Sequence, residues 1–150
     1  MHPLRNLVVG TDFSPGAESA LDFALALAIP GTTRITVIHV CELSAELGLP
    51  ESPFTPAFED ELRAACRRSL DATCARRAGS GVELSGVLRL GKASEKIHNI
   101  AAEVGAGLIL VGRHGAGGER RFPGSTAERV VRTASRPVLT VAGDRAGGLS

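Results

Sequence analysis

The chain has 150 residues, of which 43% are hydrophobic and 22% charged, and this suits one globular domain built around one buried sheet. A formal net charge of +1 and an aromatic content of 3% exclude the broad positive field and the base-stacking surface of a nucleic-acid-binding protein. No apolar run approaches the roughly 20 residues that span a bilayer, so we also expect no membrane partner.

The first expected strand covers residues 4–10. Its end is apolar at every position, which is typical of a strand that is buried on both faces. No long apolar core and no small-residue cleavage site precede it, so we expect a cytoplasmic protein without a secretory signal. Ser14 and Pro15 then provide the N-cap and the first residue of a helix, which is expected to end at Pro30.

The next elements alternate in the same way. A β-branched run at residues 34–41 predicts the second strand. Residues 42–57 contain three prolines and are expected to form a long exposed loop. Apolar residues at helical spacing predict a second helix from Phe58 to about Gly79. Residues 82–88 alternate and predict a third strand, at an edge of the sheet because one of its sides is polar.

The second half of the chain continues this order. A third helix is expected around residues 97–104, and residues 108–111 form the most hydrophobic strand. A fourth helix follows at residues 126–134, and residues 137–141 predict a short fifth strand. We expect the α/β domain to span residues 1–142, with a flexible tail at residues 143–150.

Strands that alternate with helices predict an open parallel sheet of the α/β class, with right-handed crossovers and helices on both faces. Sheets of this kind bind ligands beyond the carboxyl ends of their strands, at the point where the strand order reverses. The loops after the first, second and fourth strands are therefore the expected place for a binding site.

The loop after the fourth strand, from Gly112 to Gly124, has the composition of an anion site. Its glycines allow backbone N–H groups to approach a ligand closely. The loop leads into Ser125 and Thr126 at a helix start, where free N–H groups favour a phosphate and two hydroxyls can donate to it. The alternative is an ordinary surface loop whose Ser or Thr caps the helix.

The cysteines and histidines give no metal signature at the level of sequence. Cys41, Cys66 and Cys74 are an odd number without tight spacing, so no disulfide framework is predicted. We interpret them as small core residues in a reducing compartment. None of the four histidines has a cysteine partner at zinc spacing, and no metal site is predicted.

Several motifs together resemble the universal stress protein family over nearly the whole chain. Each motif alone would be weak, but their combination and order are specific. The segments that carry the resemblance are VVGTDFS at 8–14, GAGLILVGRHG at 105–115, GSTAERV at 124–130 and RPVLTV at 136–141.

This resemblance implies a sheet of order 3-2-1-4-5 and, in the nucleotide-binding branch, ATP between strands one and four, with or without Mg²⁺. Asp12 and Val40 would meet the adenosine end, and the end of the glycine loop would hold the phosphates. A homodimer through the strand Pro137 to Val141 is also implied. The implied binding residues are Thr11, Asp12, Val40, Val111, Gly112, Arg113, Gly115, Gly124, Ser125 and Thr126.

The glycine loop departs from the pattern of that branch. Eight residues separate Gly115 from Gly124, where the family has nine, and Pro123 removes one N–H donor. The favoured interpretation is an ATP-binding stress-response or signalling module, with at most slow hydrolysis or self-phosphorylation. The alternative is a nucleotide-free dimeric interaction scaffold of the same fold. An enzyme with another substrate ranks third, because no base is positioned beside a nucleophile.

Overall fold

The computed structural model describes residues 2–42, 55–113 and 125–142. These residues form a parallel five-stranded sheet of order β3-β2-β1-β4-β5, which confirms the predicted fold class and strand order. The strands are β1 (Asn6–Gly10), β2 (Arg34–Cys41), β3 (Glu83–Leu90), β4 (Leu108–Gly112) and β5 (Val138–Val141).

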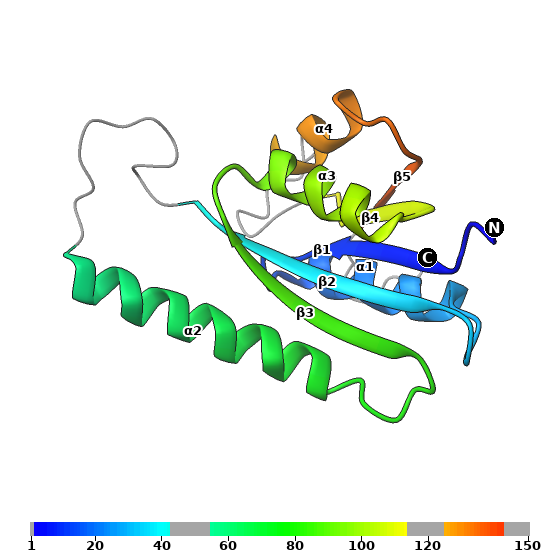
Figure 1. The fold of residues 1–150 in the computed structure, drawn as a ribbon, viewed down its shortest axis with the longest axis horizontal. Helices are drawn as coiled ribbons and strands as arrows, with labels where there is room; N and C mark the ends of the chain where they lie inside the picture. The colour runs from blue at the N-terminus through cyan, green and yellow to red at the C-terminus, as the bar shows by residue number, and fades with distance from the viewer. Residues whose placement is uncertain (1, 43–54, 114–124, 143–150) are drawn as a thin grey trace.

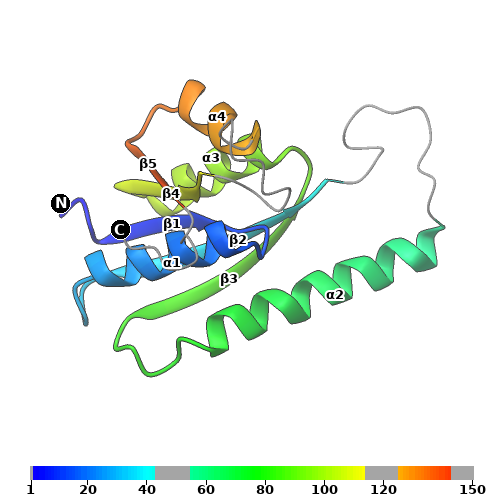
Figure 2. The ribbon, with the colours of Figure 1, turned by 180° about the vertical axis from the view of Figure 1, so that it is seen from behind.

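The described helices cover both faces of the sheet. Helices α1 and α2 lie on one face and α3 and α4 on the other, as Figure 1 and the reverse view in Figure 2 show. Their bounds are α1 (Pro15–Leu27), α2 (Pro56–Ala75), α3 (Ala93–Val104) and α4 (Ser125–Arg132). None of the described helices is long and apolar enough to cross a bilayer.

Two apolar cores follow from the alternation of side chains along β1. Leu7 and Val9 pack beneath α1 and α2, whereas Val8 packs with α3 and α4. All three side chains are fully buried, as the sequence predicts for a central parallel strand. The sheet is therefore held from both sides, and only its edges and strand ends reach the surface.

The start of α1 agrees with the prediction from the sequence, whereas α2 begins earlier than predicted. The Ser14 hydroxyl caps α1 by accepting a hydrogen bond from the N–H of Ala17 at 3.2 Å. Thr55 caps α2 in the same way, and Pro56 takes the first helical position, so the helix begins inside the expected loop. The three prolines suggested a loop, but one of them initiates the helix. The rest of that predicted loop, residues 43–54, lies outside the described residues.

Smaller differences concern strand ends. Strand β1 begins at Asn6 rather than at residue 4, because the preceding residues form a turn in which the N–H of Arg5 donates to His2. Strand β3 continues to Leu90 and lies at an edge of the sheet, as its polar side predicts. The expected tail at residues 143–150 lies outside the described residues.

Candidate functional site

The strand order reverses between β1 and β4. From β1 the chain first builds the sheet toward β2 and β3, and then returns to place β4 and β5 on the other side. The carboxyl ends of β1 and β4 are consequently neighbours, and the helices that come next in the chain, α1 and α4, lie on opposite faces of the sheet. The sequence predicts that a ligand would bind at this point of the sheet, and this stays a prediction.

A compact turn follows β1. The hydroxyl of Thr11 accepts a hydrogen bond from the N–H of Phe13, and Oδ1 of Asp12 accepts one from the N–H of Ser14, both at 3.0 Å. Phe13 has a φ of 66°, in the left-handed region. The Asp12 side chain thus stabilises the turn, while the residue remains exposed at the strand end.

The same turn is fixed to β2. The N–H of Thr11 donates to the carbonyl of Ile38 at 2.9 Å. The carbonyl of Thr11 accepts a hydrogen bond from Nδ1 of His39 at 2.8 Å, and the rings of His39 and Phe13 lie 4.5 Å apart between centroids. The backbone around Thr11 is therefore held by contacts across the sheet as well as by its own side chains.

Gly112, at the end of β4, lies directly against the start of α1. A Cβ atom at this position would be 2.7 Å from the carbonyl carbon of Gly16 and 2.9 Å from the nitrogen of Ala17. The next residue, Arg113, is exposed, and its N–H donates to the carbonyl of Val141. The glycine allows β4 and α1 to approach more closely than any other residue would.

An apolar layer lies on the α3 and α4 side of these strand ends. Val111 is buried there and Val40 is partly buried against the same cluster. Ala127 and Val130 of α4 belong to this cluster too, so packing fixes the first turns of α4 beside the end of β4. Thr126, in the first turn of α4, is partly exposed.

The structure thus places six of the predicted site residues at the ends of three neighbouring strands and two more, Ser125 and Thr126, in the first turn of α4. Ser125 begins α4. Gly115 and Gly124 lie outside the described residues, so their predicted contribution stays a prediction. The residues at the strand ends are Thr11, Asp12, Val40, Val111, Gly112 and Arg113.

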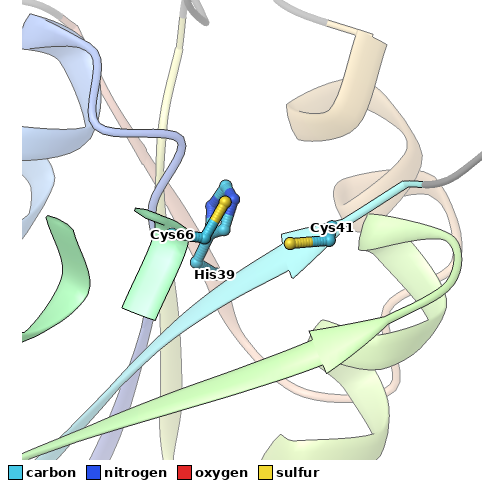
Figure 3. A group of neighbouring side chains, drawn as sticks. All are labelled: His39, Cys41 and Cys66. Carbon is cyan, nitrogen blue, oxygen red and sulfur yellow. The ribbon is translucent and has the colours of Figure 1, made fainter. Parts of the chain in front are cut away.

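Sequence analysis missed two features beside this edge. The carboxylate of Glu42, just beyond β2, accepts a hydrogen bond from the N–H of Ala93 at 2.7 Å and so caps α3. In addition, His39 and Cys41 of β2 meet Cys66 of α2, as Figure 3 shows. The spacing of His39 and Cys41, two residues apart on a strand, was the available signal for a shared face. The third member comes from a distant segment.

The thiol of Cys41 in that cluster lies in a poorly solvated environment. Burial raises the pKa of Cys41 to about 12, and a hydrogen bond with Cys66 adds to the increase. The positive charge of Arg63 acts in the opposite direction. With no metal ion bound to it, Cys41 is therefore a protonated thiol at neutral pH.

Fold and strand-end geometry together define an open parallel α/β protein whose strand order reverses between β1 and β4, the point at which sheets of this kind bind ligands. The family model of the universal stress proteins matches residues 3–142, and the chain belongs to the universal stress protein family. This finding confirms the resemblance that the sequence motifs suggested.

Individual relatives agree with that assignment. Universal stress protein MJ0531 of Methanocaldococcus jannaschii is 28% identical over 138 residues, covering 91% of this chain and 81% of its own. A solved universal stress protein from Burkholderia pseudomallei is 30% identical, with a TM-score of 0.73 and 94% and 98% of the two chains covered. The structure of the protein MJ0577 has a TM-score of 0.83 at 23% identity, covering 97% and 100%.

Two further solved structures share the fold and contain nucleotides. One is a universal stress protein in complex with cAMP, with a TM-score of 0.68 and 21% identity. The other is a family member from Arabidopsis thaliana with AMP bound, with a TM-score of 0.65 and 15% identity. At these identities the likeness to this chain concerns the fold.

Proposed function

We propose that this universal stress protein binds an adenine nucleotide at the carboxyl edge between β1 and β4 and acts as a stress-response binding or signalling module. The observation that carries the proposal is the turn of Thr11 and Asp12 beside Gly112, at the reversal of strand order. Two fold relatives contain cAMP and AMP, which supports an adenine nucleotide as the ligand class. The finer proposal is ATP, with or without Mg²⁺.

The described residues offer suitable chemistry for the two ends of such a ligand. Asp12 provides an exposed carboxylate that can accept hydrogen bonds from ribose hydroxyls. Val40 and Val111 provide apolar surface for the adenosine part. The first turn of α4, with Thr126, provides N–H groups and a hydroxyl that suit phosphate oxygens. No base beside a nucleophile is part of this proposal, and any hydrolysis or self-phosphorylation is slow.

Calorimetric titration and thermal unfolding of the full chain test the proposal. We expect ATP, AMP or cAMP to release heat and to raise the melting temperature, because a ligand of the native state stabilises it by about 2.7 kcal/mol at 100 times its dissociation constant. Titrations with and without Mg²⁺ distinguish the free nucleotide from its magnesium complex. Absence of both heat and stabilisation at millimolar concentrations of all three nucleotides would contradict nucleotide binding.

The variant Asp12→Asn tests whether the nucleotide binds beside the turn that follows β1. Asparagine keeps a side-chain oxygen for the N–H of Ser14 but removes the charge, so the fold should persist while nucleotide affinity falls about tenfold. Asp71→Asn, an exposed change on α2, is the matched control and should bind like the parent chain. Equal affinities of parent chain and Asp12→Asn would show that the nucleotide lies elsewhere.

A nucleotide-free dimeric scaffold is the second candidate. The observation in its favour is that β5 ends the described sheet, so one of its sides has no strand partner within that sheet. Such an edge can pair with a second copy of the chain. The glycine loop that is one residue shorter than in the binding branch also favours this candidate.

A further inference from the structure

We propose that His39, Cys41 and Cys66 form a binding site for a single thiophilic metal ion, with Zn²⁺ as its typical occupant. The two sulfur atoms and a ring nitrogen of His39 all lie within 4.8 Å of one another. This is the one group of three such ligands that the described part of the chain brings together. The proposal is independent of nucleotide binding.

The architecture of the sheet explains why the three side chains converge. Side chains two residues apart on a strand share a face, so His39 and Cys41 continue the row of Ile35 and Val37 that packs toward α1 and α2. Cys66 approaches from α2, which covers that face. Figure 3 shows the sulfur of Cys41 directed from β2 toward the other two side chains.

A hydrogen bond already orients the imidazole of His39. The carbonyl of Thr11 can only accept, so Nδ1 of His39 carries the proton that it donates at 2.8 Å. In a neutral imidazole, this bond leaves the lone pair on Nε2. Metal-binding histidines are commonly held by such a bond to a backbone carbonyl. The nearby ring of Phe13 further limits rotation of the imidazole.

The distances require only a modest contraction. In a tetrahedral zinc site with Zn–S bonds of about 2.3 Å and Zn–N bonds of about 2.0–2.1 Å, the ligand atoms lie about 3.5–3.8 Å apart. The ligand atoms of His39, Cys41 and Cys66 already lie within 4.8 Å of one another. Small side-chain rotations therefore suffice to close the set around one ion.

The donor set selects the class of ion. Two sulfurs and one imidazole favour Zn²⁺ or Cu⁺ over Mg²⁺ and Ca²⁺, which prefer oxygen ligands. Both thiols lose their protons to solvent when the ion binds, so two thiolates balance the charge of Zn²⁺. Three protein ligands leave a fourth position for water or an external ligand.

Metal titration of the full chain tests this site directly. The protein is reduced and stripped of metal before titration, because oxidised cysteines cannot bind. With Co²⁺ as the probe, we expect thiolate-to-cobalt charge-transfer bands that saturate at one ion per chain, and their displacement by Zn²⁺. Absence of these bands in the reduced parent chain would overturn the proposal.

Three variants assign the ligands. Cys66→Ser and His39→Gln should each weaken Zn²⁺ binding by more than about 100-fold, because each removes a metal ligand. Removal of a residue that only hydrogen-bonds to a ligand costs roughly 10–100-fold. Cys74→Ser removes the remaining cysteine of α2 and should bind like the parent chain. Circular dichroism confirms that each variant is folded, and Cys66→Ala replaces Cys66→Ser if the latter is not. Unchanged Zn²⁺ affinity in the folded Cys66 variant would refute the assignment.

Discussion

Gly112 is a residue at which the packing of the backbone leaves little freedom for a side chain. Its position lies against the backbone at the start of α1, and backbone atoms cannot move aside as the end of a flexible side chain can. The choice of glycine there follows from the close approach of two elements. A nucleotide at this edge would approach the same backbone.

Gly112→Ala should destabilise the protein by about 3 kcal/mol, because the added methyl group forces β4 and α1 apart. Urea unfolding measures the change. Gly105→Ala is the informative comparison, since Gly105 ends α3 with a φ of 66° and has open space around its Cβ position. That variant should lose only about 1 kcal/mol, from left-handed strain alone. Equal losses in the two variants would contradict the steric account.

Among the elements, α3 has an unusual beginning. Its N-cap residue, Lys92, makes no side-chain capping bond. The cap comes from Glu42, which follows β2 and lies 51 positions earlier in the chain than Ala93. A carboxylate at this point satisfies an otherwise unpaired N–H group and complements the positive end of the helix dipole.

Glu42→Ala should therefore lower the free energy of unfolding by about 1 kcal/mol, as expected for loss of a helix cap. Glu42→Gln should lose less, because its amide oxygen can still accept the bond. The comparison is Glu103→Ala. Glu103 lies farther along α3 and forms an exposed ion pair with Arg89 of β3, so its loss should change the free energy of unfolding by less than about 0.5 kcal/mol. A Glu42→Ala chain as stable as the Glu103→Ala chain would exclude the capping role.

At the scale of the whole molecule, the open side of β5 decides whether two copies can join. Pro137 and Val141 turn their carbonyls toward β4, where they accept bonds from the N–H groups of Ile109 and Arg113. In a parallel ladder the residues between them alternate, so Thr140 directs its N–H and C=O to the outer side. A strand from a second copy of the chain would form hydrogen bonds with these groups.

The homodimer proposed through residues 137–141 can be tested at this position. Thr140→Pro removes an outward N–H but leaves the bonds to β4, so it should convert a dimer into a folded monomer. Thr140→Val keeps the N–H and should remain dimeric. Sedimentation or light scattering reports the mass. A monomeric parent chain, or a dimeric Thr140→Pro chain, would rule out this interface.

Local sequence determined much of this protein. The alternation of apolar runs and amphipathic stretches predicted the parallel sheet, and the pair Ser14 and Pro15 predicted the start of α1, because these signals act over a few neighbouring residues. The motifs also indicated the family. The beginning of α2 at Pro56 was missed, since proline both starts helices and interrupts them.

Only the tertiary structure decided which distant residues meet. His39 and Cys66, or Glu42 and Ala93, are separated by more than 25 residues, and nothing in their local sequence specifies the partner. The same holds for Gly112 and the start of α1. Such contacts depend on how helices cover the faces of the sheet, and this arrangement is fixed by the burial of both apolar cores together rather than by any single segment.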